Sequence, residues 1–106
     1  VAELARAAAE GQATAVIERA LDEGRDIGVD ELATRLYASR SQLYATFKAE
    51  TGEAVGAYVR RRRMERACDL LAGGVPVGAV AERLGYPQQS AFAQAFRRAM
   101  GVSPSA

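Results

Sequence analysis

Apolar residues recur along most of this chain at intervals of three and four, the spacing that brings side chains to one face of an α-helix. No segment alternates convincingly at the period of two that a half-buried strand needs. The pattern predicts an all-α protein of about seven helices, with at most a short ribbon of sheet. The expected helices cover residues 13–23, 30–36, 39–50, 54–72, a short segment beginning near 76, 88–100, and residues 1–10, which are either helix or linker.

Turn-forming and capping residues mark the ends of these helices. Gly24, Gly52 and Gly101 each follow the last residue of an apolar pattern, where glycine readily adopts the left-handed conformation that ends a helix. Ser39 and Gln42 have the spacing of a capping box, in which each side chain bonds the backbone N–H of the other residue. The helix over 39–50 is therefore expected to begin at Ser39.

The chain contains an internal repeat. Five positions of a first copy recur 48 residues later, and three further positions recur 49 residues later. The first set is Val29, Leu32, Ala33, Arg35 and Leu36, repeated as Val77, Val80, Ala81, Arg83 and Leu84. The second set is Leu43, Phe47 and Gly52, repeated as Phe92, Phe96 and Gly101. The change of offset means that the second turn, at Gly85-Tyr86, holds one extra residue.

Each copy reads as a short helix, a tight turn and a longer helix, which is the helix-turn-helix plan. Ala33 and Ala81 occupy the position where the two helices cross closely and a small side chain is needed. A bundle with generic helical hairpins would explain one such pattern, but two matched copies favour two helix-turn-helix units.

These units divide the chain into four parts. Residues 12–53 form the first unit, 54–73 a linking helix and 74–106 the second unit. Residues 1–11 are expected to be a linker or the remnant of an upstream region, because the chain begins with Val1 rather than methionine. The linking helix is expected to act as a rigid brace whose apolar stripe packs against one or both units. That stripe comprises Met64, Ala67, Cys68 and Leu71.

Composition excludes several classes of function. The chain has no histidine and one cysteine, so a disulfide framework, a Cys/His zinc site and a histidine-based catalytic set are all ruled out. We expect no cofactor and no enzymatic activity. Cys68 lies in the apolar stripe and is expected to be a small core residue. No apolar run approaches the roughly 20 residues that cross a bilayer, so we expect a soluble, intracellular protein.

Charge is distributed unevenly along the chain. Residues 1–31 hold eight acidic and three basic residues, whereas residues 32–106 hold eleven basic and five acidic residues. The two parts have net charges of −5 and +6, although the whole chain has only +1. A basic body is compatible with a polyanionic partner, but this asymmetry alone is weak evidence.

The second helix of each unit has an outward stripe that is polar but mostly uncharged. At about 100° per residue, Phe92, Ala95, Phe96 and Ala99 share the core side of residues 88–100. The opposite side suits base edges, because glutamine can bridge adenine N6 and N7, serine can pair with several edges, and an alanine methyl can touch thymine. The candidates for base contact in the two units are Arg40, Ser41, Tyr44, Ala45, Gln89, Ser90 and Gln94.

Cations beside these stripes suit the DNA backbone. The candidates for phosphate contact are Ser39, Lys48, Arg97 and Arg98, and Arg40 could serve in the same way. Ser39 is also explained as a cap, and Tyr44 could lie along its own helix. The run Arg60–Arg63 is a weaker candidate, because successive helical residues point in four directions, so at most two of these arginines are expected to touch DNA.

Three stretches of the sequence resemble the DNA-binding domain of the AraC/XylS-type transcription regulators. They are VDELATRLYASRSQLYATFKAETG, YVRRRRMERACDLL and VAERLGYPQQSAFAQAFRRAMGVSPSA, within a resemblance that covers roughly residues 12–106. The resemblance implies sequence-specific binding of double-stranded DNA, with the second helices, about 39–50 and 88–100, in successive major-groove segments. Many family members have a longer polar or basic residue at Ala45 and arginine at Gln94.

The resemblance also implies a wider context. An effector or oligomerisation domain is expected elsewhere in the full-length chain, RNA polymerase is a further potential partner, and the location is the bacterial cytoplasm at the nucleoid. The competing interpretation is a helical protein-interaction module without DNA binding. A methyl-acceptor role would require an exposed, reactive cysteine, which Cys68 is not expected to be. Operator sequence, effector and activation versus repression stay open.

Overall fold

In the computed structural model, which describes residues 2–105 and the side chains of 11–105, the protein is entirely helical. Residues 2–105 contain no strand. The six helices are α1 (Ala2–Asp22), α2 (Val29–Arg35), α3 (Arg40–Thr51), α4 (Val55–Ala72), α5 (Val77–Arg83) and α6 (Gln89–Met100). The all-α prediction is confirmed. The helices number one fewer than expected because α1 runs through both of the first two predicted segments. Val1 lies outside the described residues.

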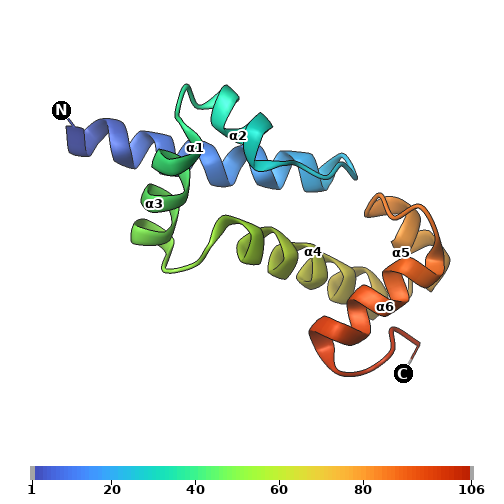
Figure 1. Ribbon diagram of the computed structural model, residues 1–106. Helices are drawn as coiled ribbons and strands as arrows, with labels where there is room; N and C mark the ends of the chain where they lie inside the picture. The colour runs from blue at the N-terminus through green and yellow to red at the C-terminus, as the bar shows by residue number, and fades with distance from the viewer. Residues whose placement is uncertain (1, 106) are drawn as a thin grey trace.

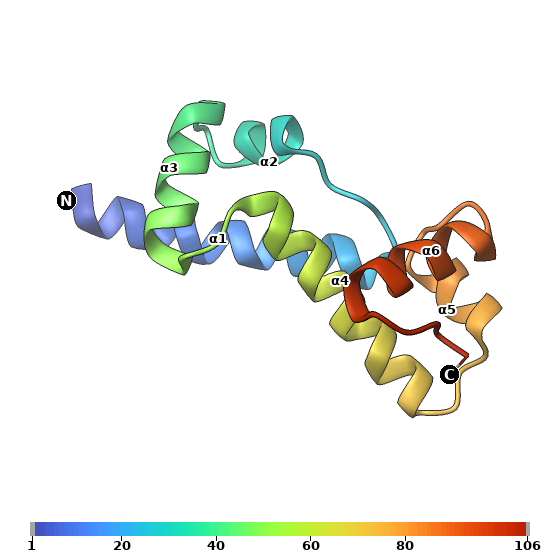
Figure 2. The ribbon, with the colours of Figure 1, turned by 60° about the horizontal axis from the view of Figure 1, so that its bottom comes forward.

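The helices form an elongated molecule of 49 × 23 × 21 Å. Figure 1 shows α2 and α3 at one end and α5 and α6 at the other, with α1 and α4 running between them. The second view confirms that the N-terminus and the C-terminus lie at opposite ends (Figure 2). No helix of residues 2–105 is long and apolar enough to cross a membrane.

The apolar residues gather in two hydrophobic clusters, one at each end. Phe47 and Ile17 are fully buried in the first cluster, and Phe92 and Val80 in the second. At roughly 1.5–3 kcal/mol for each large side chain taken out of water, this burial is the main force that holds each end together. Ala33 is buried in the first cluster and Ala81 in the second, as the helix-crossing argument predicts.

Helix α4 takes part in both clusters. Val55 and Val59 pack into the first, and Met64 and Ala67 into the second. Cys68 and Leu71, the other members of the predicted stripe, are partly buried against the second cluster. The stripe thus packs against the second unit alone, while two valines one to three turns earlier contact the first. A single helix is therefore built into both ends of the molecule.

Ion pairs fasten α1 along α4. Arg62 Nη2 donates to Glu18 Oε1 at 2.7 Å, and Arg66 Nη2 donates to the same oxygen at 3.0 Å. Arg66 also pairs with Asp22 through its other terminal nitrogen. The hydrogen bond from Arg62, helped by Arg66, holds the pKa of Glu18 below its ordinary value, although partial burial opposes the shift. Glu18 thereby joins two arginines that lie 44 and 48 positions further along the sequence.

Candidate nucleic-acid interface

Helix α3 is set in place by its cap and its buried face. Ser39 Oγ accepts a hydrogen bond from the Gln42 N–H at 3.1 Å, and Gln42 Oε1 accepts one from the Ser39 N–H at 2.9 Å, so the predicted capping box is present. Leu43 and Phe47 are buried, and the Phe47 ring meets Tyr58 edge-on at 5.3 Å. The opposite face of α3 is therefore turned toward solvent.

That exposed face carries the predicted contact residues of the first unit. All of them are exposed, and they are Ser39, Arg40, Ser41, Tyr44, Ala45 and Lys48. The oxygen of Ser39 is engaged in the cap, although its hydroxyl proton remains able to donate. Tyr44 has 45% of its surface exposed. The structure thus brings these six side chains together on one surface.

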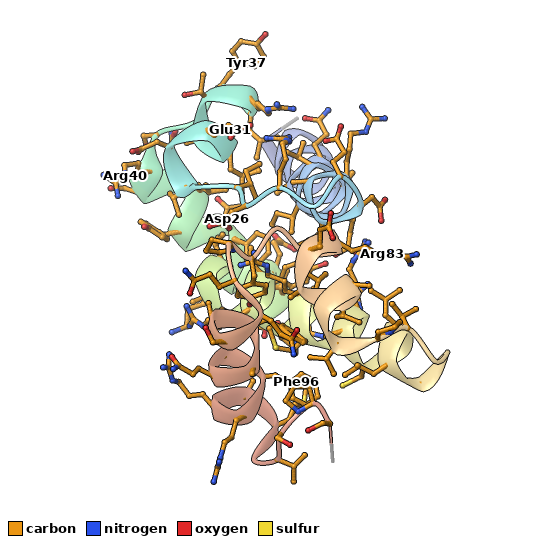
Figure 3. The ribbon with its side chains drawn as sticks, turned by 90° about the vertical axis from the view of Figure 1, so that its right-hand side faces the viewer. Asp26, Glu31, Tyr37, Arg40, Arg83 and Phe96 are labelled. Atoms are coloured by element: carbon orange, nitrogen blue, oxygen red, sulfur yellow. The ribbon has the colours of Figure 1, made fainter. Side chains whose placement is uncertain are left out.

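Helix α6 has the same buried and exposed faces as α3, but its N-terminus is capped differently. Its N-cap residue, Gln88, makes no side-chain capping bond, whereas Gly101 ends the helix with φ 80°, as Gly52 ends α3 with φ 77°. Phe92 and Phe96 are buried with their ring centroids 5.7 Å apart. Figure 3 shows Phe96 on the inner side of α6. Two aromatic anchors therefore determine which face of α6 points outward.

The outward face of α6 holds Ser90, Gln94, Arg97 and Arg98, all exposed. Ser90 Oγ donates a long hydrogen bond to Gln88 Oε1 at 3.4 Å. Gln89 is exposed but set apart from this face, because its carboxamide oxygen lies over α5, 3.0 Å from the point where a Cβ on Gly78 would be. The prediction that Ala99 faces the core is wrong, since it is exposed and lines a cleft between the two units.

Among the side chains that the structure describes, Arg40 is the one predicted contact residue with an ion-pair partner. Its Nε lies 3.2 Å from Asp30 Oδ1, and both side chains are more than half exposed. A pair this exposed is worth little, so the guanidinium can exchange its carboxylate for a phosphate at small cost. Figure 3 shows Arg40 on the same side of the molecule as α6, and Arg83 on the other side.

The arginines and lysine fall into two groups by their partners. Six arginines form ion pairs with carboxylates: Arg25, Arg35, Arg40, Arg61, Arg62 and Arg66. Within residues 11–105, by contrast, seven cations pair with no carboxylate, and they are Arg19, Lys48, Arg60, Arg63, Arg83, Arg97 and Arg98. Six of these seven cations are exposed, and three of the six, Lys48, Arg97 and Arg98, project from α3 and α6.

The four consecutive arginines of α4 point in different directions, as the helix geometry predicts. Arg61 pairs with Glu53 and with Glu65, which lies four residues further along α4. Arg62 pairs with Glu18 on α1. Arg63 donates to the Leu84 carbonyl at 2.7 Å, and its guanidinium carbon lies 4.1 Å from the Tyr86 ring centroid. Arg60 is exposed and lines the cleft.

Sequence reasoning missed this cleft, which lies between the two units. It encloses about 610 Å³, and α2, α4 and α6 contribute to its walls. Its lining is mainly apolar, with Ile27 and Val59 from the first cluster and Met64 and Tyr86 from the second. No periodic pattern could have indicated it, because its walls come from residues 26–100, which only the folded chain brings together. Among the described residues no group of carboxylates and cysteine could hold a metal ion.

Comparison with known proteins agrees with this architecture. Residues 32–106 match the family model described as a helix-turn-helix domain. A protein of Streptomyces antibioticus that is assigned to the AraC-like transcription regulators is 42% identical over 77 residues, which are 72% of this chain and 25% of that protein. The chain spans between a quarter and a third of the length of the first such relatives.

Two solved structures are similar over nearly the whole chain. The C-terminal domain of AraT, a response regulator from Geobacillus stearothermophilus, superimposes with a TM-score of 0.81 at 33% identity, covering 92% of this chain and 80% of that one. The DNA-binding domain of AdpA, a global transcriptional factor solved in complex with a target DNA, gives 0.73 at 32% identity, covering 88% and 86%. With its two helix-turn-helix units, this chain therefore belongs to the helix-turn-helix domain family of the AraC/XylS-type transcription regulators.

Proposed function

We propose that this chain is the DNA-binding part of a transcription regulator and binds double-stranded DNA sequence-specifically, with α3 and α6 in successive major-groove segments. One observation carries the proposal. The second helix of each unit exposes an uncharged polar stripe beside a cation that has no carboxylate partner within residues 11–105. Those cations, Lys48 and Arg97, occupy matching positions 49 residues apart. A groove-reading surface needs this combination of neutral base readers and backbone anchors.

Each exposed side chain has a chemical role in this proposal. In α6, Gln94 is suited to a two-bond contact with adenine, and Ser90 to a single bond with a base edge. In α3, the Ala45 methyl suits a thymine methyl, while Ser41, Tyr44 and Arg40 can donate to base edges. Gln89 would have to leave its place over Gly78 to reach a base, so we rank it last.

Backbone contacts fall to the remaining candidates. Lys48, Arg97 and Arg98 supply positive charge, and Ser39 supplies a hydroxyl donor. The length of α4 supports simultaneous binding by both units. Its 18 residues span about 27 Å at 1.5 Å each, comparable with the roughly 34 Å between successive major-groove segments on one face of DNA.

The wider setting forms part of the same proposal. Residues 12–53 and 74–106 are the two DNA-binding units, 54–73 is the helix that joins them, and 1–11 lead in from an upstream region. We propose that the chain works by binding rather than by catalysis and takes no cofactor. An effector or oligomerisation domain would complete the regulator, RNA polymerase is a further partner, and the site of action is the bacterial nucleoid in the cytoplasm.

The proposal is tested by selecting bound duplexes from a random pool and measuring their affinity over a salt series. The logarithm of the association constant should fall linearly with the logarithm of salt concentration, because phosphate contacts release counterions. Arg83→Ala is a matched control, since Arg83 is exposed on the side away from Arg40 (Figure 3) and should leave affinity and slope unchanged. No enriched sequence and no salt dependence would favour a protein-interaction module instead.

A further inference from the structure

The turn after α1 and the turn after α5 touch each other backbone to backbone. A Cβ placed on Gly85 would lie 2.1 Å from the Gly24 carbonyl oxygen, and a Cβ placed on Gly24 would lie 2.5 Å from the Arg83 carbonyl oxygen. Real Cβ atoms essentially never approach another atom closer than 3.0 Å. Neither position can therefore accept even a methyl group unless the two turns move apart.

The internal repeat shows that the turn after α5 does not itself require glycine. Tyr37 occupies the corresponding position after α2, 48 residues earlier, and its φ of 55° is also in the left-handed region. Both turns have the same hydrogen bonds: Tyr37 N–H donates to Thr34 O at 3.2 Å, and Gly85 N–H donates to Glu82 O at 3.1 Å.

The two positions differ in what surrounds them. Tyr37 is 98% exposed and points away from the molecule (Figure 3), so nothing near it limits its size. Gly85 faces the Gly24 carbonyl. The approach of the other turn, rather than the turn geometry, is thus what demands glycine at position 85.

Arg63 of α4 holds the same turn from another direction. Its Nη2 donates to the Leu84 carbonyl at 2.7 Å and lies 3.9 Å from the point where a Cβ on Gly85 would be. Its guanidinium also stacks on the ring of Tyr86, whose phenol has a raised pKa because it is partly buried. The turn is therefore held between α4 and the end of α1.

We infer that the Gly24–Gly85 contact, supported by Arg63, fixes the orientation of the second helix-turn-helix unit relative to the first and so selects the half-site spacing that the chain accepts. With α4 as the one connection, bending or twisting of this helix would change the orientation of one unit relative to the other. A second attachment away from the axis of α4 opposes both motions. Gly24 can serve as that attachment because ion pairs from Arg62 and Arg66 fasten α1 to α4.

The test compares glycine variants with equal backbone strain. Gly85→Ala is matched by Gly101→Ala, because both glycines have φ 80° and each follows a helix of the second unit, yet nothing lies within 4 Å of a Cβ on Gly101. Gly24→Ala, at φ 69°, is matched in the same way by Gly52→Ala, at φ 77°. In each pair, the difference between the variants isolates the contact from the strain.

This inference rests on the proposed DNA binding, so one readout is affinity and another needs no DNA. Affinity is measured on the selected full site, on the same site with one base pair added between its halves, and on a single half-site. We expect Gly85→Ala to lose at least about tenfold more affinity for the full site than Gly101→Ala, with equal half-site binding. Its preference for the original spacing should also weaken.

The second readout is the relative orientation of the units from residual dipolar couplings of backbone amides. One alignment tensor should describe both units in the wild-type protein and in Gly101→Ala, and two should be needed for Gly85→Ala. Arg63→Met, which introduces no clash, should show the same change if Gly85→Ala fails to fold. A single tensor in these folded variants, or equal full-site losses in Gly85→Ala and Gly101→Ala, would overturn the inference. If the wild type bound no DNA, the proposed function would be refuted, but the dipolar couplings would still test whether the Gly24–Gly85 contact fixes the orientation of the units.

Discussion

One alanine inserted between Arg62 and Arg63 should uncouple the two DNA-binding units without unfolding either of them. The insertion point lies between the α4 residues that pack into the first cluster, ending at Val59, and those that pack into the second, beginning at Met64. One extra helical residue turns everything downstream by about 100° and shifts it by about 1.5 Å. Each cluster keeps its own side chains, so the helices should survive.

The contacts that this rotation breaks are known from the structure. Arg66 would turn away from Asp22 and from Glu18, whose Oε1 accepts a hydrogen bond from Arg66 Nη2 at 3.0 Å in the structure. The turn held by Arg63 would move away from Gly24. Ion pairs at the surface are worth about 0–1 kcal/mol each, and these side chains are still in part exposed to water, so the stability loss should be modest. The effect on DNA binding should be larger, because two joined modules gain about 10²–10⁴ in affinity over one, or about 3–6 kcal/mol.

The assay is fluorescence anisotropy on full and half sites, with circular dichroism as the check on folding. We expect the insertion variant to bind the full site only about as tightly as the half-site, and to retain wild-type helicity. Asp69→Ala serves as control, because it changes an exposed side chain of α4 without shifting the helix in register, and it should bind the full site nearly as wild type does. Wild-type affinity of the folded insertion variant for the full site would refute the reasoning.

Three further outcomes are expected. Gln94→Ala should cost about 1–3 kcal/mol on the best site and relax the preference at one base pair, measured on single-base variants; unchanged preference would exclude a base contact. Lys48→Ala or Arg97→Ala should weaken binding to all sequences alike and lower the salt slope by about one unit, whereas a loss confined to one sequence would indicate a base reader. Glu18→Gln should destabilise the protein at neutral pH, because the folded pKa of Glu18 is lowered. The difference in free energy of unfolding between the wild type and this variant is fully present above the unfolded pKa of Glu18, about 4.3, and is lost as pH falls through its lower pKa in the folded protein. A difference that stays constant down to about pH 2 in urea unfolding would contradict this reasoning.

Local patterns were sufficient to predict most of the fold. Helix ends depend on neighbouring residues, so the Ser39 capping box and the stop at Gly52 could be read from the chain and are confirmed. The core faces of α3 and α6 followed from helical periodicity, because Phe47 and Phe96 lie one turn from their buried partners. The break expected in α1 is absent, since Gly11 is tolerated within the helix.

Site residues were predictable to the extent that position on a helix determines direction. Gln94 and Lys48 are exposed on the expected faces, and whether they contact DNA remains a prediction. Gln89 shows the limit of this reasoning, because helical angle placed it beside the stripe, whereas the absent side chain of Gly78 lets its carboxamide lie over α5. A side chain's direction thus depends on the space that neighbouring elements leave.

By itself, the sequence determined the all-α class and the outward polar stripes, because each depends on residues within about a dozen positions of one another. It also determined the two repeated units, because matching residues recur at offsets of 48 and 49 positions along the chain. Tertiary structure alone decided how the units sit together. Arg62 and Glu18 are 44 positions apart, and Gly24 and Gly85 are 61 apart, so no periodic pattern links them. Nor could sequence distinguish Gly85, which a neighbouring carbonyl forces to be glycine, from Gly101, which has open space around it. Contacts between distant segments arise only when the packed clusters bring their backbones together, and they carry no periodic signature in the chain.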